Sequence, residues 1–310
     1  MTVDKNEFLA DDFEFVGSKQ NIAIEKAAPS LPAWKDAFNR FKKNKGAVVG
    51  FTCILVITLF AIFAPMLSSW EFDALDYSKA NIAPNGTHWF GTDANGRDLF
   101  VRVWQGARYS LFIAVVAIFI DVIVGITYGL ISGYFGGKVD NIMQRIQEII
   151  NSIPTLVILI LLLMVMKASL VTIIIALSFT EWIGMSRVTR AQVLKIKEEE
   201  FVLASRTLGA SDFFIIFKEI LPNIYSQIII MIMMSIPNAI FYEAYLSFIG
   251  LGLPIPLASL GTLINDGFKS ITVYPYMMVI PVLVFSVLML SFNLFGDGLR
   301  DALDPTMKEM

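Results

Sequence analysis

The sequence predicts an all-α integral membrane protein that crosses the bilayer about six times. Of the 310 residues, 56% are hydrophobic and 16% are charged, whereas soluble domains carry about 25% charged residues. The mean hydropathy is +0.66. Several apolar stretches also reach the roughly 20 residues that a helix needs to cross about 30 Å of hydrocarbon. Membrane lipid is therefore the main expected surrounding of the chain.

Six apolar runs are long enough to be spans, at residues 46–68, 108–134, 142–166, 169–192, 223–249 and 275–297. Residues 1–45 precede them as a polar tail that ends in a basic cluster. Residues 69–107 form a long extracytoplasmic loop, residues 108–297 form the core with the second to sixth spans, and residues 298–310 follow as a short carboxyl terminus.

The distribution of basic residues predicts which side each segment faces. Lysine and arginine in short loops concentrate on the cytoplasmic side of a membrane. If the basic cluster before residue 46 lies inside, 18 of the 24 basic residues fall on the cytoplasmic side. The six on the other side are Lys79, Arg97, Arg102, Arg108, Lys167 and Lys269. Both termini are therefore expected in the cytoplasm.

Composition and motifs exclude several other classes of protein. A net charge of −3 gives no basic surface for nucleic acid. Cys53 and His88 are single residues of their type, so no zinc ligand set is available. The sequence nearest to a phosphate-binding loop ends in Lys138, but Ser132 takes the first glycine position and Val139 the hydroxyl position. We expect no metal, no bound cofactor and no catalysis in this chain.

Glycines recur at every fourth position in the second predicted span, at Gly125, Gly129, Gly133 and Gly137. This spacing places them along one helix face, where another helix can approach closely. Packing is the favoured interpretation, and a direct role with a solute is the alternative.

Four carboxylates lie within or near apolar runs: Asp121, Glu148, Glu181 and Glu243. A charge in lipid is costly, so such residues are expected to face protein or a water-filled path. Glu243 and Glu181, together with Asn238, are candidates for a translocation path. The alternative is that the acids lie at the membrane interface or in packing contacts.

The cytoplasmic segment at residues 198–222, here called the coupling segment, predicts two short helices joined by a turn. Gly209 offers a left-handed end to the first helix. Ser211 or Asp212 can cap the second, which runs to a break at Pro222. Its apolar residues are too many to hide in so short a segment, which favours a protein partner. The alternative is a helix that lies on lipid headgroups.

The coupling segment resembles the cytoplasmic loop by which permeases of ABC importers contact their ATPases. The family pattern reads Glu-Ala-Ala, three residues, Gly, nine residues, Ile, any residue, Leu-Pro. Ala204, Gly209, Leu221 and Pro222 match in register, while Leu203, Ser205 and Glu219 take the glutamate, second alanine and isoleucine positions. Because Leu203 takes the glutamate position, the resemblance does not imply the salt bridge that the family's glutamate would make to the ATPase.

Three further stretches narrow the resemblance to C-type permeases of the peptide and nickel family, and only residues 1–45 fall outside it. They run from His88 to Asp98 with Gly106 to Leu111 following, from Glu243 to Pro254, and from Asn293 to Pro305. The family implies six transmembrane helices of the type I ABC-importer fold in a bacterial cell membrane. It also implies a B-type permease partner, two ATPase subunits that bind ATP and Mg, and an extracytoplasmic peptide-binding lipoprotein.

Closure of the ATPase dimer would then move the coupling segment as a rigid lever. Asp93, Asn95 and Arg97 are candidates for docking the binding protein, with a self-satisfied turn at residues 93–96 as the equal alternative. Oligopeptides are the first expectation for the solute, and dipeptides, nickel and glutathione are the alternatives. A secondary transporter, which would need an embedded acid and usually a repeat, and a scaffold without a path are the competing classes.

Overall fold

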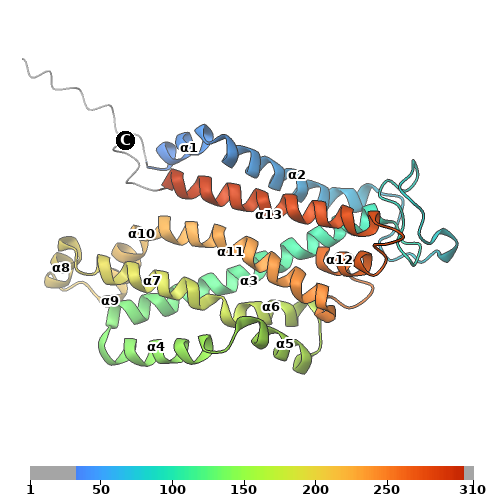
Figure 1. Cartoon of the computed structure of the whole chain (residues 1–310). Helices are drawn as coiled ribbons and strands as arrows, with labels where there is room; N and C mark the ends of the chain where they lie inside the picture. The colour runs from blue at the N-terminus through green and yellow to red at the C-terminus, as the bar shows by residue number, and fades with distance from the viewer. Residues whose placement is uncertain (1–32, 304–310) are drawn as a thin grey trace, which may run out of the picture.

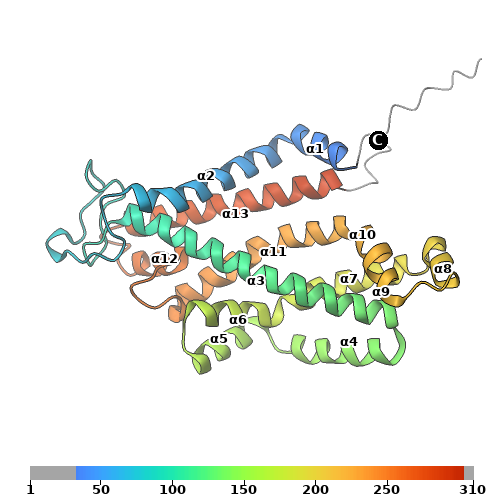
Figure 2. The ribbon, with the colours of Figure 1, turned by 180° about the vertical axis from the view of Figure 1, so that it is seen from behind.

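The computed structural model describes residues 33–303, and within this range the regular elements are all helical. Its long helices run side by side along a common axis (Figure 1). The same arrangement is visible from behind (Figure 2). The predicted all-α membrane fold is confirmed. The amino-terminal tail up to residue 32 and the end of the chain from residue 304 lie outside the described residues.

Five helical stretches are long and apolar enough to cross a membrane: α2 (Lys45–Leu67), α3 (Leu99–Phe135), α6 with α7 (Leu170–Thr180 and Trp182–Ile196), α11 with η4 (Tyr225–Leu246 and Ser247–Leu251) and α13 (Tyr276–Leu303). A sixth span results if α4 (Gly137–Asn151) and α5 (Thr155–Met166) are one broken helix, bent by 76°. Pro154 lies at that break. A proline lacks the N–H that would continue the helix, which accounts for the interruption.

Helix α3 begins earlier than the apolar run that predicts it. Its first residue is Leu99, because the Asp98 carboxylate accepts a hydrogen bond from the Val101 N–H at 3.0 Å and caps the helix. At 1.5 Å per residue, its 37 residues are about 55 Å long. The helix therefore extends beyond the hydrocarbon core and reaches both ends of the bundle.

The predicted glycine face of α3 packs against α7. A Cβ atom at Gly125, Gly129 or Gly133 would lie 2.6–2.8 Å from atoms of α7, including the Ser186 carbonyl oxygen beside Gly129. Helix packing is confirmed for these three glycines. Gly137 differs, because a Cβ atom there would meet open space. It is the first residue of α4, and its φ of +54° lies in the turn between α3 and α4.

Two helices lie where the sequence indicates only tail or loop. The amphipathic helix α1 (Ala33–Lys43) precedes α2, and α12 (Leu260–Phe268) lies between η4 and α13. Helix α12 begins with a capping box, in which the side chains of Ser259 and Thr262 each bond the other residue's backbone N–H. A short 3-10 turn, η2 (Tyr77–Lys79), is the regular element of the loop before α3.

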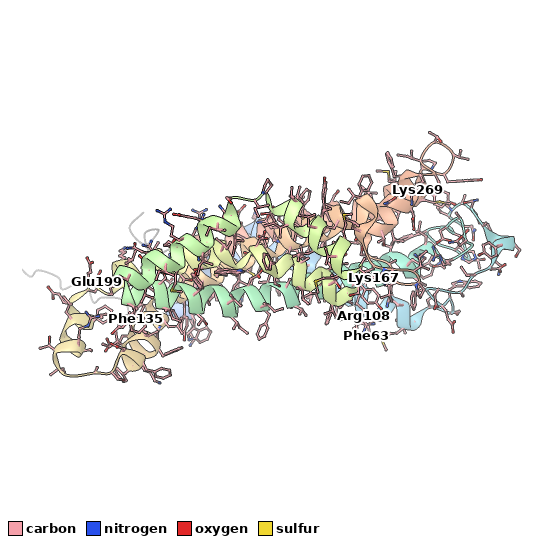
Figure 3. All side chains as sticks on the ribbon, turned by 90° about the horizontal axis from the view of Figure 1, so that it is seen from below. Phe63, Arg108, Phe135, Lys167, Glu199 and Lys269 are labelled. Atoms are coloured by element: carbon pink, nitrogen blue, oxygen red, sulfur yellow. The ribbon has the colours of Figure 1, made fainter. Side chains whose placement is uncertain are left out.

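The spans alternate between two ends of the molecule. Figure 3 shows Phe63, Arg108, Lys167 and Lys269 toward one end and Phe135 with Glu199 toward the other. Arg108, Lys167 and Lys269, which the sequence predicts outside, thus share the end opposite to the coupling segment. Which end faces the cytoplasm stays a prediction.

Candidate functional site

The coupling segment is built from two short helical pieces, as predicted. The first is α8 (Glu200–Thr207), and the second is continuous through α9 (Asp212–Phe214), η3 (Ile215–Ile220) and α10 (Leu221–Asn223). Gly209 has a φ of +85° between them, which confirms the left-handed stop. Ser211 is the cap, since its hydroxyl accepts from the Phe214 N–H at 3.3 Å. The pair projects from one end of the bundle (Figure 1).

The sequence predicts that the second helix of the segment breaks at Pro222, but the structure shows no break there. Residues Ile215–Ile220 form a π-helical turn, in which the Leu221 N–H bonds the Ile216 carbonyl oxygen. Pro222 directly follows this turn inside the continuous helix, where it supplies no N–H to the preceding turn. The helical geometry is instead interrupted at Ile224, with φ −103° and ψ 1°.

Apolar packing and one polar contact fix the coupling segment to the membrane helices, and a second polar contact is made by the residue just before the segment. Val202, Ile215 and Ile220 are fully buried in a core cluster that also contains residues of α3 and α7. The Tyr134 hydroxyl at the end of α3 donates to the Asp212 carboxylate at 2.6 Å. The Lys197 ammonium, just after α7, donates to a carbonyl oxygen of α3 at 2.9 Å. A force on the segment therefore reaches α3 and α7 directly.

The opposite side of the coupling segment exposes large apolar side chains. Leu208 is 87% exposed and Phe213 is 71% exposed. Leu203 and Ala204 of the family pattern are also exposed on α8. Water-facing apolar groups of this size are typical of a surface that another protein covers. The role of the individual pattern residues in contacting an ATPase stays a prediction.

Two departures from the family pattern contact each other. The Ser205 hydroxyl on α8 donates a hydrogen bond to one Glu219 carboxylate oxygen on η3. The other carboxylate oxygen, Oε2, is buried without a partner among the described residues. Asn223 bonds the Glu219 carbonyl oxygen at 2.6 Å. A side-chain hydrogen bond therefore joins the two helices of the segment, at the positions where the family pattern has alanine and isoleucine.

Glu243, one candidate for the translocation path, is fully buried in a hydroxyl cluster. The Ser110 and Ser247 hydroxyls each donate to one of its carboxylate oxygens at 2.7 Å. Ser259 donates to Ser247 at 3.1 Å, and the Leu260 N–H donates to Ser110 at 3.3 Å. The cluster joins α3, α11, η4 and the start of α12. As placed, the Glu243 carboxyl holds these elements together and has no exposed surface.

The other two path candidates lie apart from this cluster. Asn238 is exposed on α11. Glu181 is half-buried at the junction of α6 and α7, one helical turn after Ser178, whose hydroxyl donates to the Ala117 carbonyl oxygen of α3 at 3.2 Å. Asp121 is buried on α3, one turn after Ala117. One carboxylate oxygen of Asp121 is buried without a hydrogen-bond partner among the described residues. The structure thus brings together Glu181 and Asp121, a pairing that spacing in the sequence does not predict.

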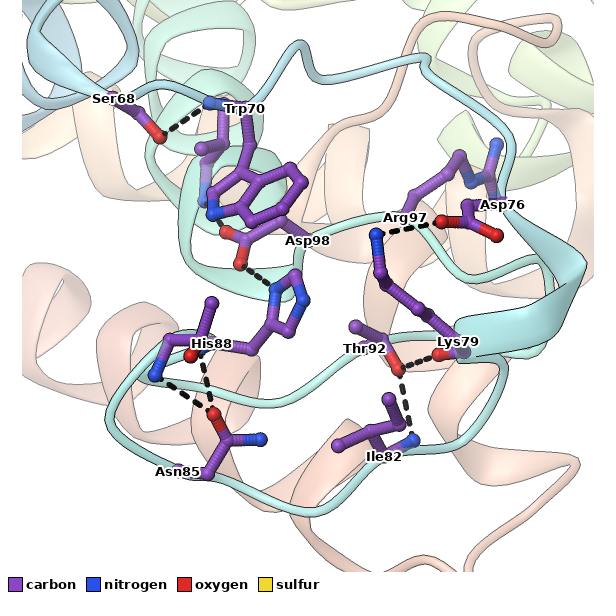
Figure 4. Close-up of polar contacts among 12 residues, drawn as sticks. Ser68, Trp70, Asp76, Lys79, Ile82, Asn85, His88, Thr92, Arg97 and Asp98 are labelled. Carbon is purple, nitrogen blue, oxygen red and sulfur yellow. Dashed lines mark hydrogen bonds and ion pairs between the residues drawn. The ribbon is translucent and has the colours of Figure 1, made fainter.

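The outer loop, residues 68–98, is folded around its own polar contacts (Figure 4). The Asp93 carboxylate accepts from the backbone N–H groups of Asn95 and Arg97 at 2.9 and 3.0 Å, and from the Arg97 guanidinium at 2.7 Å. The self-satisfied turn at residues 93–96 is confirmed. Asp93 and Arg97 are buried and Asn95 is half-buried. Asn95 is thus the most accessible of the three docking candidates, and docking itself stays a prediction.

The same loop is tied to the start of α3 and to α13. His88, the single histidine, contacts the Asp98 carboxylate through Nδ1 at 2.8 Å, next to the cap of α3. The Arg102 guanidinium donates to the Phe72 carbonyl oxygen at 3.0 Å. Tyr276 of α13 donates to the Thr92 carbonyl oxygen at 3.0 Å. These contacts make the outer loop a folded part of the bundle.

One exposed carboxylate of the outer loop is shifted in its acidity. The Lys79 ammonium, 2.7 Å away, and the Ser78 hydroxyl lower the pKa of the Asp76 carboxyl below its ordinary value. Because Asp76 is exposed, solvent screens this pair and it adds little to stability.

An ion pair at the opposite end was not predicted from the sequence. Asp140 of α4 accepts two hydrogen bonds from the Arg190 guanidinium of α7, at 2.6 and 2.5 Å, and a third from Ser132 of α3 at 2.5 Å. Two-point arginine–carboxylate contacts are geometrically specific. This contact fixes α4 to α3 and α7. In the sequence, Asp140 lies just before one predicted span and Arg190 near the end of another, and their spacing does not predict that they meet.

Comparison with known proteins places the chain in a family. Residues 125–309 match the model of the binding-protein-dependent transport system inner membrane component. Residues 33–84 match the N-terminal TM domain of oligopeptide transport permease C.

Individual relatives and solved structures agree. The oligopeptide transport system permease protein OppC of Bacillus subtilis (strain 168) is 46% identical over 297 residues, 96% of this chain and 97% of that protein. The dipeptide transport system permease protein DppC of the same organism is 45% identical over 302 residues, 97% of this chain and 94% of that protein. Inward facing structures of the MetNI methionine ABC transporter share the fold, with a TM-score of 0.54 at 18% identity over 64% of this chain and 95% of that chain. The chain therefore belongs to the family of inner membrane components of binding-protein-dependent transport systems.

Proposed function

We propose that this chain is a C-type permease subunit of an ABC importer and forms half of a translocation path for oligopeptides. It couples that path to ATP hydrolysis by partner subunits and carries out no catalysis of its own. The observation that carries the proposal is the coupling segment, which is anchored in α3 and α7 on one side and apolar on the other. A surface of this kind suits an ATPase as its partner.

We propose the remaining parts of the complex from what the family resemblance implies. A B-type permease completes the path, two ATPase subunits bind ATP and Mg below the membrane, and an extracytoplasmic peptide-binding lipoprotein delivers the solute. The complex lies in the bacterial cell membrane, with both termini of this chain in the cytoplasm. Asn95 and the neighbouring surface of the outer loop are where we place contact with the binding protein.

Substitution at Gly209 tests the coupling role. A β-branched residue is strained at φ +85°, although no heavy atom lies within 4 Å of its Cβ. We expect Gly209→Val to lower solute uptake per ATP hydrolysed while the protein still inserts. Gly209→Asn is the matched control, because asparagine tolerates the left-handed region, and it should retain coupling. Normal uptake by Gly209→Val would refute the lever role of the coupling segment.

The solute is tested by uptake of a labelled mixed peptide pool into cells with and without this chain, with nickel as a parallel label. Similar identity to oligopeptide and dipeptide permeases makes peptide length the informative readout. We expect loss of peptides longer than two residues, with nickel uptake unchanged. Loss of dipeptides alone would assign the chain to a dipeptide importer, and unchanged peptide uptake would contradict the proposal.

A further inference from the structure

Helix α1 carries an apolar ridge that the rest of the described chain leaves uncovered. Trp34, Phe38 and Lys42 follow one another at four-residue intervals, so they line one side of the helix. Trp34 is 67% exposed and Phe38 is 52% exposed. The Lys42 ammonium lies 4.4 Å from the centre of the Phe38 ring. The ridge thus combines aromatic rings with a cationic end.

The position of α1 relative to α2 places the end of this ridge, at Lys42, next to the start of a membrane span. A single residue, Asn44, separates the two helices and caps α2 through its side chain. Phe41 of α1 and Phe51 of α2 pack on the same ring, Phe295 of α13, with ring centres 5.5 and 5.7 Å away. The last turn of α1 therefore lies level with the first two turns of a membrane span, beside the end of α13 (Figure 2).

The charges around the ridge are mostly positive. Exposed lysines surround it at Lys35, Lys42, Lys43 and Lys45. The acidic residue of α1, Asp36, forms an ion pair with Arg40 at 2.7 Å. Long lysine side chains can extend along a helix while their ammonium groups reach the headgroup layer. The surface around the two exposed rings is therefore complementary to a layer of negative charge.

We propose that α1 is a membrane-surface helix that inserts Trp34 and Phe38 among lipid headgroups and binds anionic phospholipid through its lysines. Amphipathic helices with aromatic residues on one face and lysines beside them bind membranes in this way. A lipid occupant is favoured over a protein because a single residue separates α1 from a membrane span and the last turn of α1 lies level with the first turns of that span. The helix then anchors the cytoplasmic ends of α2 and α13 to the leaflet.

The test measures how deeply the ridge enters the membrane in full-length protein. In a Cys53→Ala background, a nitroxide label replaces Phe38 through Phe38→Cys, and Asn39→Cys supplies a matched label on the neighbouring polar side. The protein is placed in lipid nanodiscs of phosphatidylcholine alone or mixed with phosphatidylglycerol. Accessibility to a neutral nickel chelate and to oxygen reports the depth of each label.

We expect the label at position 38 to lose nickel accessibility and gain oxygen accessibility in the discs with phosphatidylglycerol, while the label at position 39 stays in water. Each lysine near an anionic surface changes partitioning by about five-fold. Adding K35Q, K42Q and K43Q should therefore abolish the dependence on phosphatidylglycerol. Equal nickel access at both positions in all discs would overturn the proposal. Loss of nickel accessibility at position 38 without a gain in oxygen accessibility would do so too, because a protein cover lowers access to both reagents.

Discussion

Ser205 and Glu219 show how two departures from a family pattern combine into one contact. Each alone makes its position more polar, since serine carries a hydroxymethyl group where alanine has a methyl group, and glutamate carries a carboxylate where isoleucine is apolar. Together they form a hydrogen bond across the turn at Gly209. The sequence shows both departures, but it does not predict the hydrogen bond between them, because the two residues lie 14 positions apart on different helices.

Single and double substitutions at this pair give a prediction. Ser205→Ala leaves a half-buried carboxylate without its donor, which costs about 1–3 kcal/mol. We expect lower thermal stability and fewer solute molecules imported per ATP hydrolysed. The double variant Ser205→Ala with Glu219→Ile restores the family pattern and should recover both readouts. A coupling ratio that stays normal in Ser205→Ala would show that the contact stabilises the segment without setting its geometry.

At the scale of helices, the contact of α3 with α7 depends on missing side chains. A Cβ atom at Gly129 would lie 2.6 Å from the Ser186 carbonyl oxygen, so Gly129→Ala must push the two helices apart. Overpacking of this kind costs about 1–3 kcal/mol. We expect a lower unfolding temperature in detergent.

Gly184 provides the control for this prediction. It lies inside α7, and no heavy atom lies within 4 Å of a Cβ added there. Gly184→Ala should therefore leave stability unchanged or raise it by up to about 1 kcal/mol. If both variants lost stability equally, the close approach of α3 and α7 would not be the cause.

The helices that the sequence predicts and those it misses differ in the strength of their signal. Runs of about 20 apolar residues identify spans whatever surrounds them, and the spacing of the α3 glycines indicates a close helix contact. Helices α1 and α12 have only 11 and 9 residues. Short amphipathic helices depend on packing partners, here Phe295 for α1 and the hydroxyl cluster of Glu243 for α12. Those partners become visible only in the folded chain.

At the scale of the whole molecule, the placement of the two ends can be tested by chemical labelling. In a Cys53→Ala background, we expect Lys167→Cys and Lys269→Cys to react with a membrane-impermeant maleimide in intact cells. Glu199→Cys should react only after the cells are opened, because it lies at the other end (Figure 3). Labelling of Glu199→Cys in intact cells would reverse the assignment of cytoplasmic and outer faces.

The sequence predicts the bundle and the coupling segment better than it predicts the path. Apolar length and basic flanks follow from the cost of charge in lipid, which acts on each segment separately. The surroundings of Glu243 and Glu181 depend instead on how α3, α6, α7, α11 and α12 meet. Spacing along the chain therefore left their roles open, and the folded chain places one in a closed hydroxyl cluster and the other near Asp121.

Helix α3 has a consequence for how the two faces of the membrane communicate. It is unbroken from the cap at Asp98 to its end at Phe135, and folded structure is bonded to it at both ends, through Arg102 on one side and Tyr134 on the other. A rigid connection of this kind works in both directions. By thermodynamic reciprocity, if nucleotide binding favours one arrangement of the outer loop, a protein that prefers that arrangement must tighten nucleotide binding by the same factor.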